Sequence, residues 1–354
     1  MLSGCSDDVE PVMNYRRAHW LEKLFVQVAT VAALAATYFC LWRHVQPDDP
    51  QLPVSFFASG GGASLSVFAG IAAATAVVVG ALTVFARSGG AIMAALLGVS
   101  GLAMRSQSFR GLLWSRQGDP AHSHELQSMY GQLIAEVVVL TALAVVVVVI
   151  VLLTRRLVGL VAPQWAWRDP LEDSIAPPTR GTPPPKGLLD AAMKAMGLGA
   201  VDYTVPGDKD SLVRIRPTPR ELLGRLASCL VMAGAIACAM LLVLMQSDQR
   251  GQTIFAVLAS FTLAVWIAHY TTPAPYPLLA WVLPLVLGVA FYLRGAMFHT
   301  GASPQDWTTV LPYARALPID WMTFGIGGGL LGYWFSARLH EARHMELQEA
   351  MDEP

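Results

Sequence analysis

An uninterrupted apolar stretch from residue 133 to residue 153 constrains the fold more than any other feature of the sequence. Its 21 residues, LIAEVVVLTALAVVVVVIVLL, contain one charged side chain, Glu136, and Arg155 and Arg156 follow almost directly. About 20 apolar residues in a helix, at 1.5 Å each, span the ~30 Å hydrocarbon core of a bilayer. The many valines favour a strand in water, but an isolated strand cannot satisfy its backbone hydrogen bonds in lipid. We therefore predict a transmembrane helix here.

The composition extends this prediction to the whole chain. Of the 354 residues, 54% are hydrophobic and only 14% are charged, whereas soluble domains carry about 25% charged residues. Apolar runs predict eight transmembrane helices, of which the third is short, at 24–42, 63–86, 91–104, 133–153, 222–245, 253–270, 278–293 and 320–337. The predicted fold class is all-α, a polytopic membrane helical bundle.

A polar segment divides the eight predicted helices into two groups of four. This segment contains Pro177-Pro178 and Pro183-Pro184-Pro185, which favour extended polyproline structure. Helical spacing of its apolar residues predicts a short amphipathic helix at 187–199, and a short strand is predicted at 211–216. The predicted organisation is an N-terminal segment, a first helix group, a proline-rich linker, a second helix group and a charged tail, at 1–23, 24–153, 154–220, 221–337 and 338–354.

The positions of Lys and Arg predict the orientation. Arg155 and Arg156 lie directly at the end of a predicted span, and the linker after them is rich in Lys and Arg. Cytoplasmic loops carry an excess of these residues. We predict that the linker and both termini are cytoplasmic, and that the chain is a multi-pass protein of the bacterial cytoplasmic (inner) membrane.

Charge and motif content narrow the classes of partner and cofactor. The net charge of −1 provides no general basic field, so no nucleic-acid partner is predicted. The four cysteines form no CxxC pair, and no phosphate-binding loop or dinucleotide fingerprint is present. We predict no cofactor, and we expect the partners to be the lipid bilayer and other membrane protein subunits.

One loop carries residues that metals prefer. His122 and His124 lie just before the span at 133–153, with Glu125 beside them. Two imidazoles in a strand-like loop point the same way and could bind zinc or copper if His299 or Asp306 supplied a further ligand. A polar surface loop explains the same residues more simply.

Glu136 is the only acidic residue well inside an apolar run. An ionisable residue within a membrane is a functional candidate by default. It lies three residues from the start of its run, on the predicted outer side, and Arg105 and Arg294 lie at the outer ends of the spans 91–104 and 278–293. We interpret Glu136 as a member of a structural ion pair with one of these arginines, and an ion or proton site is the alternative.

The sequence Gly98-Val99-Ser100-Gly101 resembles the nucleophile motif of rhomboid intramembrane proteases, and Ala268-His269 resembles the histidine motif of that family. The resemblance covers these six residues and would imply a serine and histidine pair in the membrane. The predicted topology places Ser100 and His269 near opposite ends of their spans, whereas such a pair needs hydrogen-bond contact. We therefore interpret the small residues as helix-packing positions.

The last predicted span is rich in glycine. Gly325 and Gly329, and Gly328 and Gly332, form two GxxxG pairs on one face of a helix. Such a face allows close contact between helices in lipid. The contact could be with a helix of this chain or with a helix of a partner.

These features support three hypotheses of function. The first is a non-enzymatic accessory or scaffold subunit of a larger inner-membrane complex, because few charges lie within the membrane and the glycine face is suited to helix contact. The second is a transporter or channel for a small solute, with Pro284 and the small-residue spans as its moving parts. The third is a membrane enzyme with a metal site at His122 and His124.

Overall fold

The computed structural model is a bundle of long helices. It describes residues 9–58, 64–115, 126–162, 203–206, 212–215, 219–272, 278–298 and 312–352. Within these residues seven helical segments are long and apolar enough to cross a membrane: Trp20–His44, Leu65–Leu82, Ser88–Arg105, Gln127–Val161, Leu223–Leu244, Arg250–Thr271 and Ala280–Met297. The predicted fold class, an all-α helical membrane bundle, is confirmed, and the chain has the architecture of a multi-pass membrane protein.

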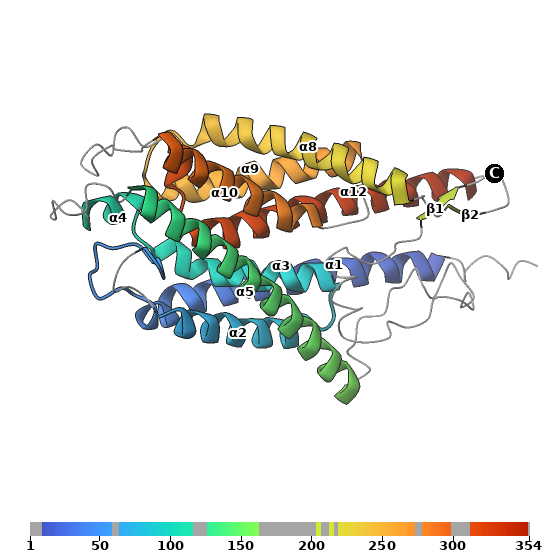
Figure 1. Ribbon diagram of the computed structural model, residues 1–354. Helices are drawn as coiled ribbons and strands as arrows, with labels where there is room; N and C mark the ends of the chain where they lie inside the picture. The colour runs from blue at the N-terminus through green and yellow to red at the C-terminus, as the bar shows by residue number, and fades with distance from the viewer. Residues whose placement is uncertain are drawn as a thin grey trace, which may run out of the picture.

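The first group of helices precedes the linker. It comprises α1 (Val9–Ala35) with its continuations η1 (Ala36–Leu41) and η2 (Trp42–His44), α2 (Leu65–Leu82), α3 (Ser88–Arg105), the short α4 (Phe109–Ser115), and α5 (Leu126–Val161). The valine-rich run lies in the middle of α5. With 36 residues, α5 is about 54 Å long, and it crosses the other helices at a steep angle (Figure 1). Tilt allows a helix longer than the bilayer to remain in it.

The second group follows the linker. It comprises α8 (Pro219–Leu244), α9 (Arg250–Thr271), α10 (Leu278–Phe298), η6 (Pro312–Arg315), α11 (Pro318–Asp320), η7 (Trp321–Gly325) and α12 (Ile326–Asp352). Pro284 lies inside α10, as the sequence indicated. α12 continues well beyond the predicted span end at Ala337, so the charged tail is helical to Asp352.

Little of the proline-rich linker is described. Its strands β1 (Tyr203–Pro206) and β2 (Leu212–Ile215) pair antiparallel, with Tyr203 opposite Ile215. β2 lies within the strand predicted at 211–216. The amphipathic helix predicted at 187–199 lies outside the described residues.

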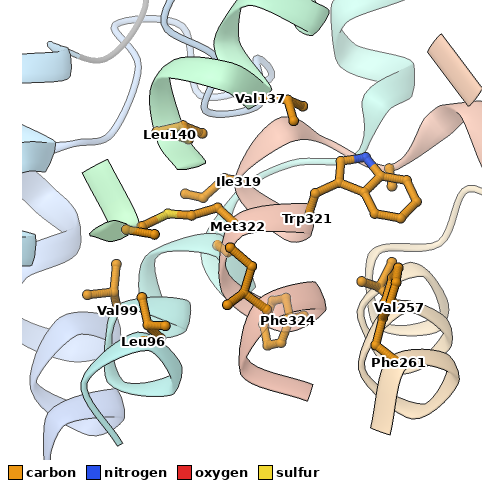
Figure 2. Packing of buried hydrophobic residues seen from close by; sticks show 14 of the residues in the cluster. Leu96, Val99, Val137, Leu140, Val257, Phe261, Ile319, Trp321, Met322 and Phe324 are labelled. Atoms are coloured by element: carbon orange, nitrogen blue, oxygen red, sulfur yellow. The ribbon is translucent and has the colours of Figure 1, made fainter. Parts of the chain in front are cut away.

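The last predicted span, 320–337, is not among these seven segments, and it occupies the centre of the bundle. Every residue from Ala316 to Leu330 is buried. Figure 2 shows Trp321, Met322 and Phe324 surrounded by side chains of α3, α5 and α9, among them Leu96, Val137 and Phe261. This segment therefore faces protein rather than lipid. Glycines, which lower its mean hydropathy, are tolerated there for this reason.

Candidate functional site

Residues 316–338 are called here the central segment, and it carries one buried charged residue, Asp320 or Arg338, toward each end. The two ends of the bundle are named after these residues, the Asp320 end and the Arg338 end. Both side chains are largely buried, at 0% and 9% exposure. A buried charge is stable only when it is paired and hydrogen-bonded. The partners of Asp320 and Arg338 therefore show which helices are held together at each end.

At the Asp320 end, Arg250 at the start of α9 forms an ion pair with Asp320. Arg250 Nη1 donates to Asp320 Oδ2 at 2.6 Å, and Nη2 donates to Oδ1, so the contact is bidentate. Arg250 Nε also donates to the carbonyl oxygen of Ala103 in α3 at 3.1 Å, and the Leu317 amide donates to Asp320 Oδ2 at 2.9 Å. A single guanidinium therefore connects α9, α11 and α3, that is, both helix groups.

At the Arg338 end, Arg338 in α12 forms an ion pair with Glu22 in α1. The second oxygen of Glu22 accepts a hydrogen bond from the amide of Arg87, in the turn between α2 and α3, at 2.9 Å. Arg155 of α5 donates to the carbonyl oxygens of Thr83 and Ala86 beside this turn. The Glu22–Arg338 ion pair connects the two helix groups a second time, and the other bonds hold α1, α5 and the turn together within the first group.

Sequence reasoning did not find these two ion pairs. Arg250 and Asp320 lie at the starts of their helices and were assigned to a short loop and a span boundary. A usable signal was present, because both residues fall at the same predicted end of their spans. Glu22 and Arg338 likewise lie at the same end, but 316 residues apart, and nothing local to either predicts that α1 and α12 are neighbours.

Glu136 of α5 is completely buried. Its Oε2 accepts hydrogen bonds from Ser55 Oγ at 2.7 Å, the Phe56 amide at 3.0 Å and the Phe57 amide at 3.3 Å. All three donors belong to the loop between η2 and α2. The Oε1 atom is buried and has no hydrogen-bond partner among the described residues. Glu136 therefore fixes this loop against the bundle through one carboxylate oxygen.

The predicted ion pair of Glu136 with Arg105 is not formed. Arg105 Nη1 instead donates to the Tyr38 carbonyl oxygen at 3.3 Å, and its guanidinium lies 5.1 Å from the Tyr38 ring centroid and 5.9 Å from that of Trp42. Arg294, the other proposed partner, has an exposed side chain near the end of α10. The Ser55 hydroxyl and the loop amides take the place of a cation at the buried carboxylate.

The four glycines of the predicted packing face contact two different helices of this chain. A Cβ atom at Gly325 would lie 2.9 Å from the Pro284 side chain, and one at Gly329 would lie 2.9 Å from Ala280 Cα, both in α10. At Gly328 and Gly332, a Cβ would lie 2.7 and 2.2 Å from backbone carbonyl oxygens of α9. Close helix contact is thus present, and it is made within the chain.

The serine and histidine of the rhomboid-like motifs are not paired. Ser100 Oγ donates to the Leu97 carbonyl oxygen of its own helix at 2.5 Å, and His269 Nδ1 lies 2.8 Å from Ser336 Oγ of α12. The glycines of the first motif allow α1 to approach, because a Cβ at Gly98 would lie 2.6 Å from Ala33 Cβ. These residues thus have packing roles in the structure.

The predicted metal ligands His122 and His124 lie outside the described residues, as do His299 and Asp306. Within the part of the chain that the structure describes, no group of three or more His, Cys, Asp or Glu residues could hold a metal ion.

Comparison of the chain with protein-family models, with curated proteins and with solved structures finds no match. The function must therefore be inferred from the geometry.

Proposed function

We propose that the protein is a non-enzymatic accessory or scaffold subunit of a larger complex in a bacterial inner membrane. The observation that carries this proposal is the central segment. It is packed on both helix groups along its length, connected to them by buried charges at both ends, and continuous with a polar helix that leaves the bundle.

The contact between the helix groups favours a rigid unit. Transporters built from two helix groups work by rocking one group against the other around a central site. Here a Cβ at Gly327 of α12 would lie 2.5 Å from the Leu97 side chain of α3, so the two central helices are in close contact. Rocking would also break the Arg338–Glu22 ion pair, which would leave a buried charge without its partner, and it would break the hydrogen bonds from Arg250 to the Ala103 carbonyl oxygen.

The polar helix offers a surface for a partner outside the membrane. Residues 338–352, called here the polar extension, form the last part of α12 and contain eight Arg, Glu, Asp or His residues: Arg338, His340, Glu341, Arg343, His344, Glu346, Glu349 and Asp352. Such a sequence is too polar for lipid, and from Arg338 it extends by about 21 Å. The beginning of α1 lies at the same end of the bundle (Figure 1). Two helix ends connected by the Glu22–Arg338 pair would present a fixed docking platform.

A truncation tests this proposal. A chain ending at His340 keeps Arg338 and its ion pair but lacks most of the polar extension. The full chain, purified in mild detergent from its native membrane, should carry other chains in a fixed ratio. The truncated chain should have the same melting temperature as the full chain but should no longer carry the other chains. Equal recovery of other chains with both forms would show that the polar extension has no role in assembly.

One observation favours the second candidate, a transporter of a small solute. Glu136 Oε1 is buried without a hydrogen-bond partner among the described residues, and an acid of this kind can serve as a proton or ion site. For a transporter, the purified chain in liposomes should show proton-coupled solute flux, and Glu136→Gln should abolish this flux. The third candidate, a metal enzyme, rests on His122 and His124 alone.

A further inference from the structure

A cavity of about 330 Å³ opens at the Arg338 end of the bundle. It lies between the turn that joins α2 to α3 and the last two turns of α5, and its lining comprises Val84, Ser88, Leu152, Arg155, Arg156, Gly159 and Leu160. The residues of the two ion pairs described above do not line the cavity, and neither packing nor the proposed scaffold role accounts for it.

Two consecutive arginines make the cavity cationic. Arg155 is held in place by its hydrogen bonds to the Thr83 and Ala86 carbonyl oxygens, which do not neutralise its charge. Glu22 acts on Arg155 electrostatically, but its carboxylate is committed to Arg338 and to the Arg87 amide. The Arg156 side chain is exposed. Arg250 and Arg338, and not Arg156, form the ion pairs found among the described residues.

The start of α3 adds to this positive field. α3 begins at Ser88, which lines the cavity. The first amides of a helix have no intrahelical acceptor, and together with the helix dipole they favour an anion. The arginines and the helix start therefore face the same space from two sides, which suits a phosphate with several acceptor oxygens.

The rest of the lining is apolar and faces the lipid side of the bundle. Leu160 is 73% exposed, and Leu157 beside it on α5 is 54% exposed. Val84, in the turn after α2, and Leu152 of α5 continue the apolar surface inward. A free phosphate would gain nothing from these residues, whereas an acyl chain could lie along them.

We propose that this cavity binds the phosphate of an anionic phospholipid, with Arg155 and Arg156 as the phosphate ligands and the acyl chains along the exposed leucines of α5. Basic pockets between transmembrane helices bind anionic headgroups in this way. In the predicted orientation, the cavity faces the inner leaflet.

Lipid binding to the purified full chain tests the proposal. The probes are phosphatidylglycerol, phosphatidylcholine and inorganic phosphate, each added to delipidated protein in mild detergent. Bound lipid is counted by native mass spectrometry, and the melting temperature is recorded. Phosphatidylglycerol should bind and raise the melting temperature, and the other two probes should have little effect.

Three variants make the test specific. Arg156→Ala should weaken phosphatidylglycerol binding about fivefold, Arg156→Lys should restore part of it, and Gly159→Leu should block it by filling the cavity. Arg225→Ala is the matched control, because Arg225 is an exposed arginine near the start of α8 that does not line the cavity. Equal binding by the Ala variant and the wild type would overturn the proposal. Stabilisation by inorganic phosphate as large as that by the lipid would overturn the assignment to lipid.

Discussion

At the scale of single residues, the structure shows how charge is accommodated inside a membrane bundle. Among the residues whose burial the structure describes, three acids are buried, Glu22, Glu136 and Asp320, and each accepts at least one backbone amide hydrogen bond. Two of them also have an arginine partner, and Glu136 has the Ser55 hydroxyl instead. Such bonds offset the cost of removing a carboxylate from water.

Removal of Arg250 tests the pairing at the Asp320 end. Arg250→Ala would leave Asp320 buried without a cation, a change that typically costs about 3–5 kcal/mol. Because Asp320→Asn removes the stranded charge, the double variant should be more stable than Arg250→Ala alone. The melting temperatures of the single and the double variant in detergent would show this order. Arg105→Ala is the control, because it removes an exposed arginine whose hydrogen bond is to a backbone carbonyl oxygen, that of Tyr38, and it leaves no buried acid without a cation.

Glu136 gives a second residue-scale prediction. Glu136→Gln keeps an acceptor for Ser55 Oγ and the loop amides, whereas Glu136→Ala leaves these donors unpaired, at about 1–3 kcal/mol for each buried group. We expect a modest loss of thermal stability for Gln and a larger loss for Ala. Equal stability of the two variants would show that the loop at 54–58 does not depend on the carboxylate.

At the scale of elements, the helices were predictable and their neighbours were not. Hydropathy located α5, and the GxxxG spacing located the glycine face of the last span, because both signals are contained in a short stretch of sequence. The division of those glycines between α9 and α10 depends on how three helices cross, which no local pattern encodes. The same holds for Glu136, whose donors lie about 80 residues away in a loop.

The contacts of the α12 glycines predict an order of tolerance. Gly332→Ala would place a Cβ 2.2 Å from the Thr262 carbonyl oxygen, a backbone atom that cannot move alone. Gly327→Ala would meet the end of the Leu97 side chain, which can adopt another rotamer. We expect Gly332→Ala to cost about 1–3 kcal/mol and Gly327→Ala less.

Gly131→Ala is the control for these glycine variants, since nothing lies within 4 Å of its added Cβ. Thermal unfolding in detergent would measure all three. A melting temperature for Gly332→Ala equal to that of Gly131→Ala would mean that α9 and α12 are further apart than the structure shows.

At the scale of the whole molecule, the orientation in the membrane stays a prediction. In a background with its four cysteines replaced by serine, Ser123→Cys in intact cells should react with an impermeant thiol reagent. Thr182→Cys should be protected until the cells are opened, because the linker is predicted to be cytoplasmic. Labelling of Thr182→Cys alone would reverse the assigned orientation.

The central claim for the whole molecule is that it acts as one rigid member of a larger assembly. Native mass spectrometry of the complex extracted from its own membrane in mild detergent tests this claim most directly. We predict a particle that contains this chain together with at least one different membrane chain in a constant ratio, and that stays intact when excess phosphatidylglycerol is added. A particle that contains only this chain and lipid, and that carries out solute flux after reconstitution, would contradict the claim.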